Sequence, residues 1–174
     1  GIAADIHGNV FVADADTNRN CLLKFLYDFE NKDLIFIDYI MSGFKSPYDI
    51  SIDDKATEDD VQDDCIFVTD LGNHRIVQLS FDGAFLNEYG SFGDESLQFK
   101  FPAPIAVLDN SDQNVAYLSI GDIGNSRVVN MSTNGDWYTV PMSVNDEIVD
   151  IDVYDNEIYV LERYCGLLHK IRWP

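Results

Sequence analysis

A turn sequence that recurs three times along the chain constrains the fold more than any other feature. The copies are Val12-Ala13-Asp14 followed by Arg19, the stretch VTDLGNHR at 68–75, and the stretch GDIGNSR at 121–127. Each copy follows an apolar run with β character and precedes another. Such a repeat decides the architecture before local signals do, because each unit buries its surface against its neighbours.

The spacing of the copies predicts an all-β fold of the β-propeller type. The aspartates at 14, 70 and 122 are 56 and 52 residues apart, and Glu162 follows 40 residues later at the same place in a weaker fourth copy. Periods of roughly 40–50 residues are typical of propeller blades, each a four-stranded antiparallel sheet. We therefore expect one domain over 1–174, with about four blades near 1–47, 48–102, 103–147 and 148–174, the last one incomplete.

Fifteen strands are predicted, and no helix. Short runs of alternating or β-branched and aromatic residues define them, and the patterns i, i+3, i+4 and i+7 are not sustained anywhere. Tight hairpin turns are expected at Asp82-Gly83 and Asn134-Gly135, because glycine readily takes a positive φ. The predicted strands are 1–5, 9–14, 21–27, 34–40, 48–53, 65–70, 75–81, 84–89, 105–108, 115–120, 127–132, 137–140, 148–153, 157–161 and 167–171.

The repeated turn has a physical role that can be stated from its residues. The aspartate closes a strand and can accept backbone N–H bonds, while Gly and Asn tolerate the left-handed conformation of a tight turn. The arginine five residues later can pair with that carboxylate. We predict a structural lock in each blade, and a catalytic role of Asp70 and Arg75 is the alternative.

These residues resemble the NHL repeat family, whose signature runs roughly G-I-A-V-D, G-N-I-Y-V-A-D, G-N-H-R-I, F-D and G. The matching segments are 1–5, 8–14, 70–76, 81–83, 88–93 and 122–128. The match fades in the first loop, where Thr17 replaces the asparagine, and fails at 163–166. The resemblance implies a ring of about six blades, so we expect the chain to be part of a larger propeller or to complete its ring with another subunit.

The charge of the chain limits its partners. With 31 Asp and Glu against 11 Lys and Arg, the net charge is −20, so nucleic-acid phosphates would be repelled. A surface this acidic suits solubility, calcium, cationic partners or a saline setting. No apolar run is long enough to span a membrane. The composition slightly favours an extracytoplasmic or cell-surface location.

Three cysteines, Cys21, Cys65 and Cys165, are too few and too odd in number for a disulfide framework. Buried thiols are therefore expected, with a single bridge as the alternative.

Asp14, Asp16 and Asn18 place oxygen ligands at alternate positions, as many calcium loops do. They form the candidate metal site, with a solvated turn as the alternative. Phe25 stands at the twelfth loop position, where an EF-hand has Glu, so an EF-hand is excluded. No other cofactor is required.

Three loops are candidates for contacting a protein partner. The first carries the acidic residues, and the others are the loop 92–100 and an aromatic tip at the hairpin near residue 137. The residues concerned are Glu58, Asp59, Asp60, Asp63, Asp64, Trp137 and Tyr138. Function in such folds lies on loops carried by a rigid scaffold, so the sequence favours a non-catalytic module for protein binding or scaffolding.

Two other functions stay open. Amidating lyases of this fold hold zinc with axial histidines, and related lactonases hold calcium with axial Glu, Asn and Asp. The histidines here, His7, His74 and His169, occupy different places in their blades and have no metal-ligand spacing. No G-x-S-x-G elbow supports nucleophilic catalysis. The third possibility is a structural role in a larger assembly.

Overall fold

The computed structural model describes residues 1–54, 64–108, 115–142, 147–154, 157–163, 166 and 168–172. Its strands form four antiparallel sheets in which sequence neighbours pair. They are β1 (Ile2–Ala4), β2 (Asn9–Asp14), β3 (Cys21–Asp28) and β4 (Asp33–Ile40); β5 (Pro47–Asp53), β6 (Cys65–Asp70), β7 (Arg75–Ser80) and β8 (Phe85–Tyr89); β9 (Pro102–Leu108), β10 (Tyr117–Asp122), β11 (Arg127–Ser132) and β12 (Trp137–Pro141); and β13 (Ile148–Tyr154), β14 (Glu157–Glu162) and β15 (Leu168–Arg172). The predicted all-β fold is confirmed, since the helices among these residues are two single 3-10 turns, η1 (Leu71–Asn73) and η2 (Ile123–Asn125).

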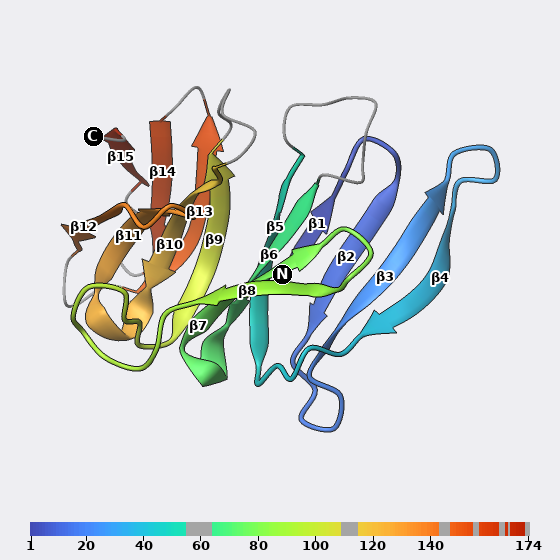
Figure 1. Ribbon diagram of the computed structural model, residues 1–174. Helices are drawn as coiled ribbons and strands as arrows, with labels where there is room; N and C mark the ends of the chain where they lie inside the picture. The colour runs from blue at the N-terminus through green and yellow to red at the C-terminus, as the bar shows by residue number, and fades with distance from the viewer. Residues whose placement is uncertain are drawn as a thin grey trace.

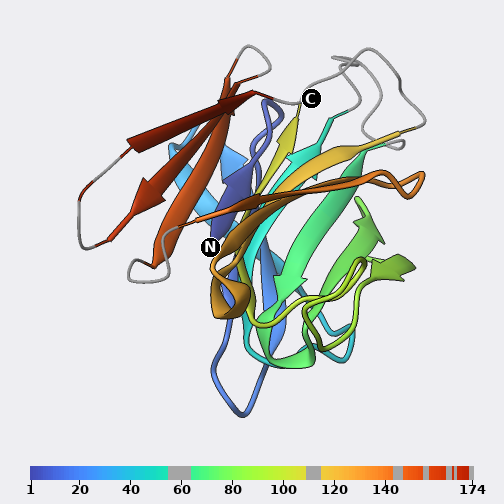
Figure 2. The ribbon, with the colours of Figure 1, turned by 90° about the vertical axis from the view of Figure 1, so that its left-hand side faces the viewer.

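The sheets follow one another around an axis as the blades of a β-propeller (Figure 1). We number them blade 1 (β1–β4) to blade 4 (β13–β15). Each first strand contacts the next first strand, β1 with β5, β5 with β9 and β9 with β13. Figure 2, turned by 90°, shows blade 4 at the left, at an angle to the other sheets. The first strands therefore form the hub, and the fourth strands lie at the rim.

The local sequence explains the hairpins. Gly83 and Gly135 have φ of 93° and 101°, and each donates its N–H to a serine carbonyl three residues earlier, at Ser80 and Ser132. Both predicted tight turns are confirmed. The pairing of first and second strands shifts register beside the repeated acid in blades 2, 3 and 4. Such a bulge bends the strand where it approaches the turn.

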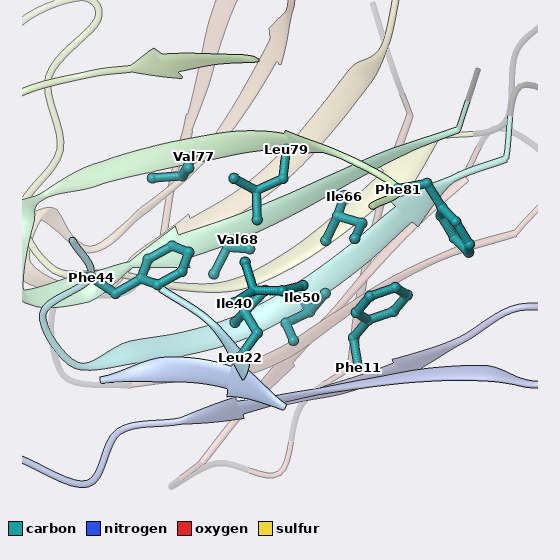
Figure 3. Close-up of a cluster of buried hydrophobic side chains, with 10 residues drawn as sticks. All are labelled: Phe11, Leu22, Ile40, Phe44, Ile50, Ile66, Val68, Val77, Leu79 and Phe81. Carbon is teal, nitrogen blue, oxygen red and sulfur yellow. The ribbon is translucent and has the colours of Figure 1, made fainter. Parts of the chain in front are cut away.

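Apolar side chains of successive blades bury each other. Figure 3 shows the cluster between blades 1 and 2, made by Phe11, Leu22, Ile40, Phe44, Ile50, Ile66, Val68, Val77, Leu79 and Phe81. Comparable clusters lie between blades 2 and 3 and between blades 3 and 4. Each sheet alternates its side chains between two faces, so each inner blade is buried on both.

Cys21 and Cys65 are buried thiols, as expected, and Cys165 lies outside the described residues. The described part of the chain contains no helix with the length and hydropathy needed to cross a bilayer.

Candidate functional site

The repeated turns are carboxylate-centred locks in blades 2 and 3. Asp122 is fully buried at the end of β10. Its Oδ1 accepts the Lys100 N–H at 2.7 Å, and its Oδ2 accepts Asn125 Nδ2 at 2.7 Å and Arg127 Nε at 2.8 Å. The carboxylate thereby joins the second strand, the following turn and the loop that enters the same blade.

Blade 2 repeats this geometry almost atom for atom. Asp70 accepts the Lys45 N–H at 2.7 Å, Asn73 Nδ2 at 2.8 Å and Arg75 Nε at 2.8 Å. After the turn, His74 has a φ of 59°, the left-handed conformation expected there. The predicted pairing of aspartate and arginine is therefore confirmed. Both oxygens of each buried carboxylate accept hydrogen bonds from the surrounding turn and loop.

The first and fourth turns depart from the pattern. In blade 1, Asp14 lies opposite Cys21, whereas Asp70 lies opposite Arg75. Arg19 still reaches Asp14 at 2.8 Å, but from the loop and with 53% of its side chain exposed. In blade 4, Glu162 takes the place of the aspartate and contacts His169 Nε2 at 3.0 Å.

The three residues of the calcium prediction share the first turn. Asp14 Oδ1 accepts the Asp16 N–H at 2.9 Å, and Asp16 Oδ1 accepts the Asn18 N–H at 2.9 Å. The Asp14 carboxylate also carries the ion pair with Arg19. Calcium binding at this turn stays a prediction.

An aromatic patch lies on the same end of the blades as the locks. We define it as His74, Phe92, Leu97 and Phe101. The His74 ring lies between two phenyl rings, with its centroid 4.9 Å from that of Phe92 and 4.7 Å from that of Phe101. Phe92 is 63% exposed, Leu97 49% and Phe101 40%. The patch therefore presents large apolar side chains to solvent.

The patch is held by an ordered loop between β8 and β9. The loop returns to its start through a bridge between Phe92 and Phe99, and Phe99 is fully buried in the core between blades 2 and 3. The Phe101 N–H donates to His74 Nδ1 at 3.1 Å, which ties the loop to the turn of blade 2. Sequence reasoning found this loop but missed His74 and Phe101; the dense aromatics around 92–101 were the available signal.

The other predicted loop residues are placed differently. Asp64 is buried immediately before β6, and residues 58, 59, 60 and 63 lie outside the described residues. Trp137 is half-buried, with its ring 5.2 Å from that of Phe99 and 5.9 Å from the Arg127 guanidinium. Tyr138 is 47% exposed. The hairpin that carries both aromatics leaves the end of blade 3 opposite to the locks.

A polar cleft of about 390 Å³ lies at the hub, between the first strands of all four blades. Asp49, Ser51, Asp150 and Asp152 line it among small and aliphatic side chains. Burial raises the pKa of the Asp49 carboxyl, against hydrogen bonds from the amides of Ile105 and Ile50 that lower it. Sequence reasoning missed this cleft, whose acids are scattered in the sequence and meet only at the axis.

The cleft offers an acidic environment for a cationic group. Within the part of the chain that the structure describes, however, no three His, Cys, Asp or Glu side chains are grouped so that they could hold one metal ion.

The fold defines the chain as a β-propeller, and comparison with solved structures agrees. It is similar to BBS1N from its complex with ARL6DN, with 13% identity and a TM-score of 0.64, over 100% of this chain and 52% of that one. It is also similar to virginiamycin B lyase from Staphylococcus aureus, with 14% identity and a TM-score of 0.58, over 99% and 55% of the two chains.

A third similar structure is an auxiliary nutrient binding protein from Bacteroides thetaiotaomicron, with 13% identity and a TM-score of 0.64, over 95% and 45% of the two chains. At such identities the likeness shows the fold alone. The chain spans about half the length of these structures. No protein-family model matches the sequence, and no curated protein matches it significantly.

Proposed function

We propose that the chain is an NHL-type propeller that acts as a non-catalytic protein-binding module, and that the aromatic patch contacts the partner. The observation that carries this proposal is the exposure of Phe92, Leu97 and Phe101 on one ordered loop. Aromatic anchors on a rigid surface supply most of the binding energy of protein interfaces. Exposed apolar patches on folded proteins mark interaction sites.

The surroundings of the patch support the same proposal. The locks at Asp70 and Asp122 fix the turns beside it, so little conformational entropy is lost when a partner binds. The net charge of −20 attracts a partner with basic residues around its apolar contact surface.

Selection of short random peptides displayed on phage tests this proposal. Peptides selected on the wild-type protein are then measured against two matched double variants. Phe92→Ala with Leu97→Ala removes half of the patch, and Phe85→Ala with Leu86→Ala removes equally exposed side chains from β8. We expect affinity to fall at least tenfold, about 1.4 kcal/mol, for the first pair only. Equal binding to both double variants would refute the proposed site.

A metal-dependent propeller enzyme is the second proposal, favoured by the acids of the axial cleft. Calcium and zinc titrations followed by calorimetry would reveal a bound ion. Asp49→Asn with Asp150→Asn should abolish binding at the axis, whereas Asp16→Asn should abolish binding at the first turn. Unchanged binding in both variants would exclude both places.

A further inference from the structure

Blade 1 leaves uncovered a sheet face whose counterpart in blade 2 is buried. Strand register makes the two faces equivalent. Val12 and Val68 each lie two residues before the repeated aspartate of their blade, and Ile2 pairs with Val12 as Ile50 pairs with Val68. In blade 2 this face comprises Ile50, Ile66, Val68, Val77, Leu79 and Phe81, all in the core with blade 1. The same positions of blade 1 hold Ile2, Val10, Val12, Leu23, Phe25 and Tyr27, which we call the open face.

The open face is apolar and extends onto β4. Ile2 is 67% exposed, whereas Ile50 is 4% exposed. Phe36 on β4 is 44% exposed, and its ring lies 5.6 Å from that of Phe25 on the open face. A hollow of about 570 Å³ lies on this side of the blade, lined by Ile2, Val10 and Tyr27, with the charged residues Asp5, Lys32 and Asp33 at its edge. An uncharged sheet face of this kind is expected to be covered.

Two kinds of polar contact, called devices below, join neighbouring blades, one at each of two buried interfaces. Between blades 1 and 2, Lys24 Nζ donates to the Phe81 carbonyl at 3.2 Å and lies 5.2 Å from the Phe11 ring centroid and 4.9 Å from that of Phe81. Between blades 2 and 3, Asp49 Oδ2 accepts the Ile105 N–H at 3.1 Å, and Ser51 Oγ accepts the Val107 N–H at 3.0 Å.

The outer face of blade 4 carries both devices at the same register. Tyr159 lies opposite Lys170 as Phe11 lies opposite Lys24. Asp150 and Asp152 occupy the positions of Asp49 and Ser51, because Ile151 is opposite Val160 as Ile50 is opposite Val68. The Lys170 side chain is half exposed, and its ammonium now pairs with Glu157 on its own sheet. Leu161 and Leu168, on the same face, are 40% and 63% exposed.

The devices on blade 4 match the open face of blade 1. Tyr27 stands at the position of Phe81, six residues after the residue opposite the repeated acid. Ile2 and Ala4 stand at the positions of Ile105 and Val107. The residue that precedes the aligned isoleucine of each first strand also alternates between blades. It is Asp49 in blade 2 and Asp150 in blade 4, but Gly1 in blade 1 and Pro104 in blade 3. Blade 1 is therefore the kind of blade that should follow blade 4.

We propose that two copies of this chain form a closed ring in which blade 4 of each copy packs on the open face of the other. Lys170 of one copy then lies over Tyr27 of its partner, beside a hollow that carries Asp5 and Asp33 as well as Lys32. Asp150 and Asp152 accept hydrogen bonds from the N–H groups of Ile2 and Ala4. The two contacts are identical, as cyclic symmetry requires.

The size of the ring fits. Each copy contributes four sheets, so two copies give eight blades, the upper end of the range of about four to eight and more than the roughly six that the NHL resemblance implies. This proposal is independent of the aromatic patch, which lies on another surface.

Sedimentation equilibrium of the 174-residue protein is the first test, and we expect a monomer–dimer equilibrium. Ile2→Ser, on the open face, should raise the dimer dissociation constant at least tenfold, because its counterpart Ile50 is 4% exposed in the covered interface. Phe85→Ser, at an exposed apolar position on the fourth strand of blade 2, should leave it unchanged. A monomer at every accessible concentration, an open series of larger oligomers, or equal effects of both variants would overturn the proposal. Circular dichroism confirms that each variant is folded.

Cross-linking distinguishes this ring from other dimers. A mixture of the single variants Tyr27→Cys and Lys170→Cys, each made in a Cys165→Ser background, should yield cross-linked dimers when treated with a short bis-maleimide. Either variant alone, and the Cys165→Ser protein, should yield none, because Cys21 and Cys65 are buried. Dimers formed by Tyr27→Cys alone would show that two open faces meet each other, which contradicts the head-to-tail ring, as would a mixture that gives no product.

Discussion

Asp122→Asn is the sharpest test of the turn locks, because it changes a charge and leaves the shape. The asparagine Oδ1 can still accept the Lys100 N–H, which the aspartate accepts at 2.7 Å. Its amide nitrogen, however, replaces the oxygen that accepts from Asn125 and Arg127. Three donors then face one another at a buried position, and the guanidinium loses its counter-charge.

The expected loss of stability follows from burial. The Asp122 side chain is 0% exposed and that of Arg127 14%, and removing one partner from a buried ion pair costs about 3–5 kcal/mol. The two lost hydrogen bonds to a charged group, at about 1.5–3 kcal/mol each, give a similar range of about 3–6 kcal/mol. With a urea dependence of about 2 kcal/mol per molar, the unfolding midpoint should fall by about 2 M.

Asp14→Asn is the matched control for the urea measurement. It removes the same type of pair in blade 1, but Arg19 is 53% exposed, and exposed pairs contribute about 0–1 kcal/mol. We therefore expect a large midpoint shift for Asp122→Asn and a small one for Asp14→Asn. Equal shifts, or a loss below about 1 kcal/mol for Asp122→Asn, would refute the argument that burial makes this lock structural.

Three further predictions concern the core, the turn and the hub. Leu118→Ala, at a fully buried position, should cost about 2–5 kcal/mol in urea unfolding, against at most about 0.5 kcal/mol for the exposed Leu86→Ala. Gly124→Ala should destabilise by about 1–3 kcal/mol, because a Cβ would lie 2.5 Å from the Lys100 carbonyl oxygen. Asp49 should titrate above its unfolded-state pKa of about 3.9, as its buried carboxyl has a raised pKa. Between those two pKa values the folded chain binds more protons than the unfolded chain, so the contribution of Asp49 to the free energy of unfolding falls as pH rises. Asp49→Asn should remove that slope. Identical pH profiles of the free energy of unfolding for wild type and variant would contradict it.

The locks show how far the repeat alone could go. The spacing of Asp70 and Arg75, and of Asp122 and Arg127, predicted the ion pairs because a five-residue step across a tight turn leaves few arrangements. The repeat did not predict that Asp14 would lie opposite Cys21. The loop of blade 1 has six residues, 15–20, between the paired residues, whereas that of blade 2 has four, 71–74, and the spacing of aspartate and arginine is the same in both.

The sites at the surface depended on contacts between distant segments. His74 belongs to an ordinary repeat turn, and it became part of the aromatic patch only because the loop before β9 folds back onto it. Asp49 and Asp150 are about a hundred residues apart in the sequence and line one cleft, because first strands converge at a propeller axis.

The amino-acid sequence by itself determined the blade repeat, the fifteen strands, the hairpin turns and the ion pairs of the turns in blades 2 and 3, since these follow from short-range periodicity and turn chemistry. Only the tertiary structure decided which face of each sheet is covered, which acids meet at the axis and where aromatic side chains gather. Those features arise when sheets pack against one another, and the energy of that packing depends on residues that no local pattern connects.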